Sequence, residues 1–404
     1  MSFINLNKFI SENVIFRKES FFNNDLQKHA STLGNAIKDK SVLVIGGAGT
    51  IGSSYIKAVL KFHPVKLVVI DINENGLTEL TRDLRSSNNI IVPASYTTYP
   101  VNFSDKVFEK IFKNEGPFHI VANFAAHKHV RSEKDHYSIE AMIENNVFKA
   151  KTLLDLLSQN PPEKFFCVST DKATNPVNVM GATKKLMEEV IMSYADTLPI
   201  ATARFANVAF SNGSLLFGYL ERFLKRQPLT CPSDVMRFFV SPEESGQICM
   251  LACMLGDSGD IFFPKLKEGQ MENFKDITDR FIKANGYRID LCTSEQEAKD
   301  KAAVLNENSE AYPVLYFKTN TSGEKLFEEF YAQKDEVDLE TYSSLGVIKN
   351  GIKRKPEEID QMINQLKALM DSGKAGKSEI VGLISEIIPD FSHIETGVGL
   401  DQKM

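Results

Sequence analysis

Two neighbouring side chains of this 404-residue chain, Asp171 and Lys172, are of the types that carry out acid–base chemistry. They follow an apolar run, residues 165–168, that is short enough to be a buried strand, and Asn175 and Pro176 mark a turn behind them. Ligands in open parallel sheets bind just beyond the carboxyl ends of the strands, so the pair stands where chemistry is expected. Taken alone, however, such a pair is more often a solvated charge pair in a loop.

The helix that we expect to begin near Met180 favours the functional interpretation. It places Met180 and Lys184 one helical turn apart on the same face. In short-chain dehydrogenases this spacing is Tyr-x-x-x-Lys, so a methionine replaces the tyrosine here. The stretch from Phe165 to Glu188, FFCVSTDKATNPVNVMGATKKLME, closely resembles the STDKA...NPxNVMGAxK signature of the nucleotide-sugar 4,6-dehydratases, which belong to the extended branch of that superfamily.

A glycine-rich turn predicts a dinucleotide site. An expected strand over residues 41–45 leads into glycines with the spacing G-x-x-G-x-x-G and then into a helix. The turn needs glycine dihedral angles, the backbone must approach a pyrophosphate, and the helix must pack close to the strand, while the amides at the helix N-terminus hold the phosphates. The residues that we expect around the phosphates are Gly46, Gly49, Thr50, Ile51 and Gly52.

The next expected strand, residues 66–70, ends in Asp71. An acidic residue about 20 positions beyond the glycines binds the hydroxyl groups of the adenosine ribose, which favours NAD over NADP as the cofactor. The alternative is a solvated residue at a strand end.

The resemblance implies further contacts to the cofactor. Ala125 and Ala126 end the strand expected over residues 119–126 and leave room for it, and Lys184 holds the nicotinamide ribose. Asn146 matches an asparagine that steadies the backbone of the active site and a water molecule.

The resemblance also implies the substrate-binding residues Lys128, Arg204, Asn207, Ser214 and Arg237. Asn207 would donate to a phosphate and Ser214 would lie near the base, while the planar guanidinium of Arg237 suits a diphosphate. A solvated lysine describes Lys128 equally well, and a structural ion pair describes Arg204 nearly as well. Residues 323–329, GEKLFEE, match a GEKLYEE segment of the family's substrate lobe.

The mechanism implied by the resemblance is an internal oxidation and reduction. The C5 hydrogen of a hexose becomes acidic only when C4 is a ketone. Asp171 is then the acid toward O6 and Lys172 the base at C5, provided that the site keeps Asp171 protonated and Lys172 neutral. Met180 cannot accept the O4 proton, as the tyrosine of ordinary members does. Either Thr170, Asp171 or a water molecule takes it, or the proton leaves by a route that the sequence does not show.

The resemblance implies UDP-N-acetylglucosamine as the substrate. The methionine-bearing subgroup is associated with retention at C5, and the expected role is in bacterial surface-glycan or nonulosonate sugar biosynthesis. A rival interpretation is a UDP-sugar 4-epimerase, which shares the cofactor but needs the tyrosine and has no use for the acid–base pair. A second rival, suggested by the lost tyrosine, is an inactive nucleotide-binding scaffold.

Length and a hydrophobic content of 43% allow a large core. We expect an α/β protein with a Rossmann-like, doubly wound parallel sheet and a smaller C-terminal substrate-binding lobe. The expected parts are a helical extension (1–40), an NAD-binding domain (41–205), a substrate lobe with some chain crossing between the lobes (206–345) and a helical tail (346–404).

A net charge of −6 argues against a partner that is a nucleic acid or an acidic membrane. Five cysteines without a CxxC pair, the absence of a signal peptide and the lack of a long apolar run favour a cytoplasmic protein without membrane insertion. No metal site is expected, because His127 and His129 have no converging third ligand. The expected partners are a UDP-sugar and further copies of the chain, in a homodimer or a larger homo-oligomer.

Overall fold

One large sheet forms the body of the molecule. The computed structural model describes residues 4–320, 322–323, 325, 328–349, 351 and 353–397. Within these residues the strand order of the nine-stranded sheet is β14 (Val337–Asp338), β15 (Leu345–Ile348), β10 (Asp260–Pro264), β6 (Ile200–Ala203), β5 (Lys164–Val168), β4 (Ile120–Asn123), β1 (Ser41–Ile45), β2 (Lys66–Ile70) and β3 (Ser95–Tyr99). The strands from β10 to β3 pair in parallel, while β15 pairs antiparallel with β10 and with β14.

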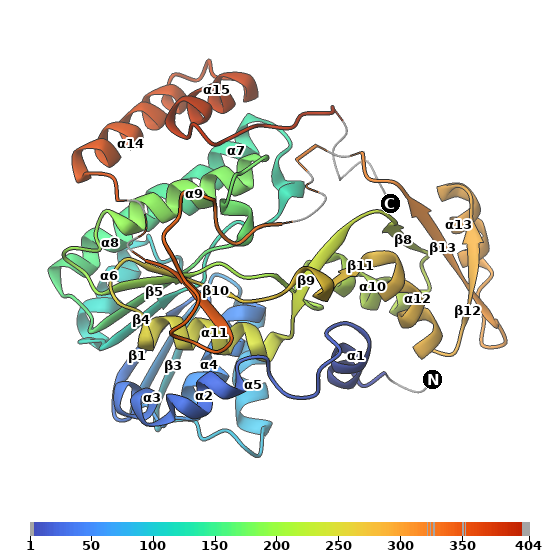
Figure 1. The fold of residues 1–404 in the computed structure, drawn as a ribbon, viewed down its shortest axis with the longest axis horizontal. Coiled ribbons are helices and arrows are strands. Elements are labelled where there is room, and N and C mark those ends of the chain that lie inside the picture. The colour runs from blue at the N-terminus through green and yellow to red at the C-terminus, as the bar shows by residue number, and fades with distance from the viewer. Residues whose placement is uncertain are drawn as a thin grey trace.

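Both faces of the sheet are buried, as the apolar strands require. Leu43 and Ile45 of β1 belong to one core and Val42 and Val44 to the other, because successive side chains of a strand point to opposite faces. The first core is closed by α6 (Lys106–Glu115), α7 (His136–Ile143), α8 (Lys149–Gln159), α9 (Val179–Met192), α14 (Pro356–Asp371) and α15 (Lys377–Ile387). The second is closed by α2 (Asn23–Lys28), α3 (Ala30–Ile37), α4 (Thr50–Leu60), α5 (Glu74–Ser86) and α11 (Pro242–Leu255). Figure 1 shows the sheet between these two helical layers, so the expected doubly wound α/β fold is confirmed.

The sheet has a topological switch point between β1 and β4. From β1 the chain proceeds outward to β2 and β3, whereas β4, β5 and β6 extend the sheet in the opposite direction. Crevices at such points lie beyond the carboxyl ends of the strands and receive ligands in open α/β sheets. The glycine-rich turn after β1 and the loop after β4 flank this crevice.

A smaller lobe with its own core lies beside the sheet, at the right of Figure 1. Its helices and strands are α1 (Leu6–Asn13), α10 (Leu215–Leu224), α12 (Phe274–Ala284), α13 (Glu295–Ala303), β7 (Asn207–Val208), β8 (Leu229–Pro232), β9 (Met236–Val240), β11 (Met271–Asn273), β12 (Arg288–Cys292) and β13 (Ala311–Phe317). The chain between residues 206 and 345 contributes to both bodies, because β10 and α11 return to the large sheet.

The N-terminal extension, which the sequence analysis expected to be helical, contains the helices α1, α2 and α3. Asn5 caps α1 through its side chain, and α2 and α3 meet at His29. Phe9 is buried in the core of the small lobe and Phe22 in the core of the large sheet. The extension therefore joins the two bodies instead of lying on one of them.

No helix of the described residues is long and apolar enough to cross a membrane.

The C-terminal helices form part of the main core, which leads to a stability prediction. Leu366 of α14 is fully buried, so Leu366→Ala should lower the free energy of unfolding by about 2–5 kcal/mol, through lost burial and the cavity left behind. Urea denaturation followed by circular dichroism measures this change. The exposed neighbour Gln365 supplies the control, since Gln365→Ala should stay within about 0.5 kcal/mol of the wild type. An equal, small effect of both substitutions would mean that α14 is not packed as described.

Candidate active site

The turn after β5 carries the acid–base pair. Asp171 begins a short helical turn, residues 171–173, and is 2% exposed. Its Oδ1 accepts hydrogen bonds from the Thr170 hydroxyl at 2.8 Å and from Lys172 Nζ at 3.2 Å. The Lys172 ammonium also lies 3.4 Å from Oε1 of Glu328. Asp171 and Lys172 are thus a mostly buried pair, not the solvated pair of the alternative interpretation.

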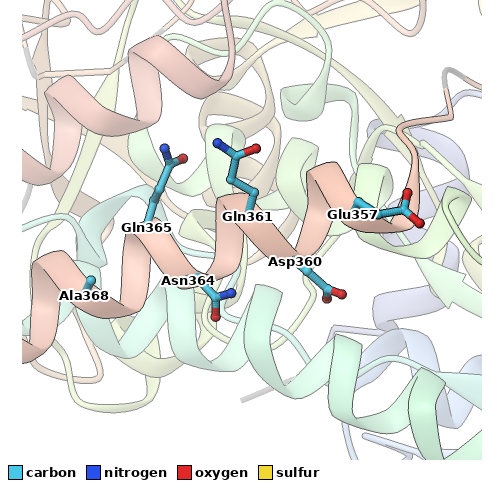
Figure 2. A pocket seen from close by; sticks show the side chains of 6 residues that line it. All are labelled: Glu357, Asp360, Gln361, Asn364, Gln365 and Ala368. Atoms are coloured by element: carbon cyan, nitrogen blue, oxygen red, sulfur yellow. The ribbon is translucent and has the colours of Figure 1, made fainter.

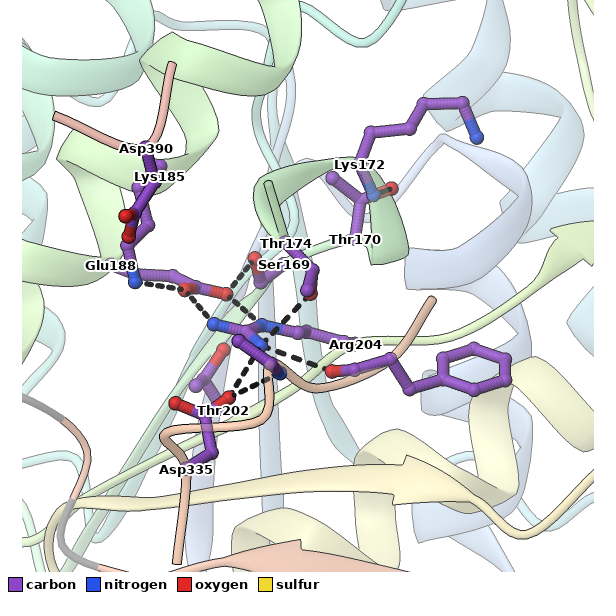
Figure 3. Close-up of polar contacts among 12 residues, drawn as sticks. Ser169, Thr170, Lys172, Thr174, Lys185, Glu188, Thr202, Arg204, Asp335 and Asp390 are labelled. Carbon is purple, nitrogen blue, oxygen red and sulfur yellow. Dashed lines mark hydrogen bonds and ion pairs between the residues drawn. The ribbon is translucent and has the colours of Figure 1, made fainter. Parts of the chain in front are cut away.

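A buried ion pair contacts the residues on both sides of this turn. Arg204 donates to both carboxylate oxygens of Glu188, at 2.9 Å and 2.7 Å, and the two side chains are 3% and 2% exposed. Glu188 also accepts from the Ser169 hydroxyl at 2.5 Å, and Arg204 donates to the Thr174 hydroxyl at 3.0 Å (Figure 3). The pair therefore holds the residues on either side of positions 170–173.

Arg204 is not among the residues that line the pocket in which the other expected substrate-binding residues lie. Its guanidinium instead donates to Glu188, Thr174 and the Phe330 carbonyl. In Figure 3 the side chain of Lys172 extends away from this cluster. The expectation of a substrate contact is corrected here: the ion-pair alternative describes Arg204. Burial alone would raise the pKa of Glu188, but the charge and hydrogen bonds of Arg204 outweigh it and lower the pKa to about 2.

Helix α9 approaches the turn very closely. A Cβ added at Gly181 would lie 2.4 Å from the Lys172 carbonyl oxygen, so only glycine fits there. Asn178 caps the helix by accepting from the Gly181 amide at 2.7 Å. Met180 is buried, and Lys184 donates to the Val168 carbonyl at 2.7 Å. Burial lowers the pKa of Lys184 to about 8.

The C-terminal segment, to which the sequence analysis assigned no chemistry, also holds the loop before α9. The amides of Ser392 and Ile394 donate to the carbonyls of Pro176 and Val177, at 3.1 Å and 3.0 Å. Glu133 accepts from the amide of Val179, the first residue of α9, at 2.7 Å. The residues between the turn at positions 171–173 and α9 are thus held from two distant parts of the chain.

A pocket of about 740 Å³ opens between the two lobes. Four of the five expected substrate-binding residues line it, Lys128, Asn207, Ser214 and Arg237, and so does Lys172. Further cationic residues that the sequence analysis did not identify are Arg131, Arg222 and Lys225. Arg222 and Lys225 lie at the end of α10 and Arg131 follows β4, so no single local pattern could have grouped all three. Glu221 is the acidic residue in the lining, and the surplus of positive charge favours an anionic ligand.

The pKa of Lys172 differs from the expectation. Burial alone would lower the pKa of Lys172, but the carboxylates of Asp171 and Glu328 outweigh it and raise the pKa above its ordinary value. The raised pKa favours the ammonium form of Lys172, whereas the expected base is a neutral amine. Glu328, which the sequence analysis quoted within residues 323–329 without giving it a role, is the second carboxylate beside the amine. Residues Glu324, Leu326 and Phe327 of that segment lie outside the described residues.

The glycine-rich turn after β1 fits a dinucleotide. Gly46 has a φ of +74°, and a Cβ added to it would lie 2.5 Å from the Ala125 amide nitrogen, so β1 and the loop after β4 meet through this glycine. A Cβ on Gly52 would lie 2.3 Å from the Gly46 carbonyl oxygen, which keeps α4 against the strand. By contrast, a Cβ on Gly49 would approach only the Gly46 carbonyl oxygen among the described residues, at 3.5 Å. Packing within the protein does not require glycine at position 49, whereas a ligand against the backbone does.

The other expected cofactor residues gather at the same edge. Asp71 follows β2 and accepts from the Ala48 amide at 2.9 Å, and the Thr50 hydroxyl accepts from the Asn212 amide at 2.9 Å. Asn146 binds both the amide and the carbonyl of His127, at 2.8 Å and 3.0 Å, and donates to the Thr183 hydroxyl at 3.0 Å. It thereby ties the loop after β4 to α9. Ile51 lies in the first turn of α4, and Ala125 and Ala126 follow β4.

Two other features do not form a competing site. A hollow along α14, shown in Figure 2, has no cationic group among its lining residues, which are Glu357, Asp360, Gln361, Asn364, Gln365 and Ala368. Glu133, His393 and Glu395 are close enough together for a metal ion. Lys377, however, pairs with Glu133 at 3.3 Å and with Glu395 at 2.5 Å, so an ammonium already neutralises these carboxylates.

Comparison with known sequences gives a family and relatives. The family described as "Polysaccharide biosynthesis protein" matches residues 42–350. A protein of Methanocaldococcus jannaschii, called uncharacterized membrane protein MJ1061, is 32% identical over 322 residues, which are 78% of this chain and 87% of that protein. The probable polysaccharide biosynthesis protein EpsC of Bacillus subtilis is 28% identical over 75% of this chain, but the chain spans only 49% of EpsC.

Comparison with solved structures gives the fold. Pen from Bacillus thuringiensis covers 81% of this chain, and the match includes 98% of Pen, with a TM-score of 0.62 and 21% identity. Another similar structure is DesIV, a dTDP-glucose 4,6-dehydratase from Streptomyces venezuelae solved with NAD bound. The match covers 73% of this chain and 89% of the DesIV chain, with a TM-score of 0.54 and 18% identity. These likenesses establish a shared architecture.

The Glu188–Arg204 pair leads to a prediction with a pH dependence. Arg204→Met leaves Glu188 buried without its partner and should lower the free energy of unfolding by about 3–5 kcal/mol at pH 7. The pKa of Glu188 in the folded protein is depressed from 4.5 to about 2, so its stabilising effect is present above pH 4.5 and is lost as the pH falls toward 2. The deficit of the variant should therefore narrow over that interval in urea denaturation experiments.

The double variant Arg204→Met/Glu188→Met is the control. It should recover most of the lost stability, because neither position 188 nor position 204 then carries a buried charge. If Arg204→Met is as stable as the wild type but binds nucleotide sugars more weakly, the contradictory conclusion follows that Arg204 contacts the substrate.

Proposed function

The chain belongs to the polysaccharide biosynthesis protein family, and from this premise we propose that it catalyses the NAD-dependent 4,6-dehydration of UDP-N-acetylglucosamine. The product is UDP-2-acetamido-2,6-dideoxy-4-keto-hexose, formed with retention of configuration at C5. The observation that carries the proposal is the pairing of a buried carboxyl group and an amine at the end of β5, with the amine of Lys172 lining the pocket between the lobes. Elimination of water across C5 and C6 needs one acid and one base at the same edge of the sugar.

The pocket suits a nucleoside diphosphate sugar. Arg237 offers a planar guanidinium for phosphate oxygens, and Lys128, Arg131, Arg222 and Lys225 add positive charge along the lining. Phe217, Phe239, Phe274 and Phe317 supply apolar surface for the base and the sugar ring. Lys172 lies in the same lining, so the reacting sugar belongs at its end of the pocket.

The cofactor that we propose is NAD, as in the DesIV structure. Gly46, Gly49 and Gly52, with the amides of Thr50 and Ile51, would hold the pyrophosphate, and Asp71 would bind the adenosine ribose. When bound, the nicotinamide supplies reversible oxidation at C4 of the sugar. Lys184 would donate to the nicotinamide ribose from the position that it holds next to Val168.

The side chains of the turn provide a path for the protons. The hydroxyl of Thr170 donates to Asp171 and is itself able to accept, so it can take the O4 proton and pass its own to Asp171. Asp171 is then protonated and gives this proton to O6 as water leaves. In the same sequence the amine of Lys172 takes the proton from C5, and the ammonium, whose protons exchange with solvent, later delivers a proton to the same face, which retains the configuration.

The buried Met180 separates this proposal from its main rival. A 4-epimerase removes the O4 proton with a tyrosine at that place, and Met180 has no group that accepts a proton. A 4-epimerase also has no step for which Asp171 and Lys172 would need to lie in the pocket. The second rival, an inactive scaffold, leaves the same pair without a role.

The reaction gives the first test of this function. In heavy water, purified protein incubated with UDP-N-acetylglucosamine should give a 4-keto-6-deoxy sugar with deuterium at C5, measured by NMR. Lys172→Ala should lower the rate by at least about a hundredfold, because the C5 step loses its base, while NAD remains bound. Lys61 is exposed at the C-terminal end of α4, and Lys61→Ala is the control, which should keep the wild-type rate. An unlabelled C4 epimer as product, or an alanine variant at position 172 with nearly full activity, would reject the proposal.

The phosphate site gives a second test. Gly49→Ala should fold as the wild type does, because its added Cβ meets nothing closer than 3.5 Å among the described residues, yet it should weaken NAD binding at least about tenfold by crowding the pyrophosphate. Calorimetric titration measures the affinity, and thermal unfolding checks the fold. Gly34→Ala in α3 is a matched control. Its added Cβ has no neighbour within 4 Å among the described residues, and the substitution should leave NAD affinity unchanged. If the Gly49→Ala variant binds NAD with normal affinity, the phosphates do not bind against this turn.

A further inference from the structure

The ammonium of Lys172 raises a question that the proposed mechanism leaves open, namely where its proton goes before the amine acts as a base. Glu328 is the nearest group outside the turn, with its Oε1 3.4 Å from Lys172 Nζ. Its side chain is 4% exposed, and among the described residues nothing donates a hydrogen bond to its other oxygen, Oε2. A carboxylate that is buried and half satisfied is costly, and it becomes less so when it takes up a proton.

We propose that Glu328 accepts the ammonium proton of Lys172 once substrate fills the pocket, and so sets Lys172 free as the base. Glu328 is a positioning residue in this scheme, because it acts through Lys172 and not on the sugar. The inference rests on the proposed function, since it concerns the base of that reaction.

The charged groups around Glu328 are compatible with this transfer. Lys172 and Asp171 face it from the turn after β5, Arg237 lies 3.9 Å away on β9, and Lys325 lies on its own segment. Burial raises the pKa of Glu328, although Lys172, Arg237 and Lys325 oppose the shift, and burial alone would lower the pKa of Lys172. Burial thus favours the neutral pair over the ion pair, and a bound sugar removes still more water from both groups.

The proton balance of the step closes. An N–H bond of the Lys172 ammonium breaks and an O–H bond forms on Glu328, which turns the ion pair into an amine and a carboxylic acid. The amine then takes the C5 proton, and the electron pair of the C5–H bond moves toward the C4 ketone. After the sugar regains its proton at C5 from Lys172, the proton on Glu328 returns to the amine, so the pair ends as it began.

The pH dependence of turnover distinguishes this role from a purely structural one. In the wild type the pair keeps one shared proton across the neutral range, so kcat/KM should be nearly flat there. In Glu328→Gln the amine must lose its proton to solvent before substrate binds, so kcat/KM should fall at least about tenfold at pH 7 and rise about tenfold per pH unit toward the pKa of Lys172. Glu328→Asp keeps a carboxylate and should restore the flat profile at a reduced rate.

The adjacent Glu329 gives a matched control, because it is exposed and its carboxylate pairs with Asn175 at 3.2 Å. Glu329→Gln should behave as the wild type. A loss in Glu328→Gln that is the same at every pH would overturn the inference and leave Glu328 as a packing residue.

A measurement without turnover separates failure of this inference from failure of the proposed function. In protein labelled with ¹³C at the lysine ε-carbons, the resonance of Lys172, assigned with Lys172→Arg, reports the pKa of its amine. That pKa should be lower in Glu328→Gln than in the wild type and unchanged in Glu329→Gln. An unchanged pKa in Glu328→Gln would show that the two groups share no proton, whatever the substrate is. Wild-type protein that forms no 4-keto-6-deoxy sugar but shows the shift would reject the proposed function alone.

Discussion

The candidate active site depends on the buried ion pair between Glu188 and Arg204. Removing two charges from water costs several kcal/mol for each ion, so such a pair is tolerated only when hydrogen bonds satisfy nearly all of its polar atoms. Here the carboxylate also accepts from Ser169, and the guanidinium also donates to Thr174 and to the Phe330 carbonyl. Ser169 and Thr174 flank the turn that carries Thr170, Asp171 and Lys172, so the desolvated ion pair keeps this turn rigid.

Two close backbone approaches complete this arrangement. Gly46 brings the turn after β1 against the loop after β4, and Gly181 brings α9 against the carbonyl of Lys172. In each case a Cβ would overlap backbone atoms, which cannot move aside as a flexible side chain can. The dinucleotide edge and the acid–base turn are thus set at fixed positions relative to the same parallel sheet. The C-terminal segment adds hydrogen bonds from Ser392 and Ile394 to the loop between the turn and α9, so residues distant in sequence also maintain this geometry.

The distribution of charge matters more for this site than the net charge does. The chain as a whole carries −6, yet the pocket between the lobes is lined mainly by cationic groups. Clefts with low-dielectric walls concentrate the field of the charges that line them, so an acidic protein can still attract an anionic ligand to one place. Within this field Glu328 is an exception, because it faces Lys172 and Arg237 in the interior. A buried carboxylate at that position fits a role in proton transfer better than a role in binding a diphosphate.

The sequence alone determined the class of the fold, because the alternation of apolar strands with helical segments and a glycine turn after the first strand are local patterns with few architectures that satisfy them. It also determined that residues 170–172 follow β5 and that Met180 and Lys184 share a face of α9, since both facts depend on short-range geometry. Tertiary structure decided what each of these groups faces. Arg204 is held by Glu188 instead of lining the pocket, Lys172 is paired with Glu328, and the N-terminal helices join both lobes. These contacts link residues far apart in the chain, and neither the burial nor the neighbouring charge that sets an ionisation state is encoded in local spacing.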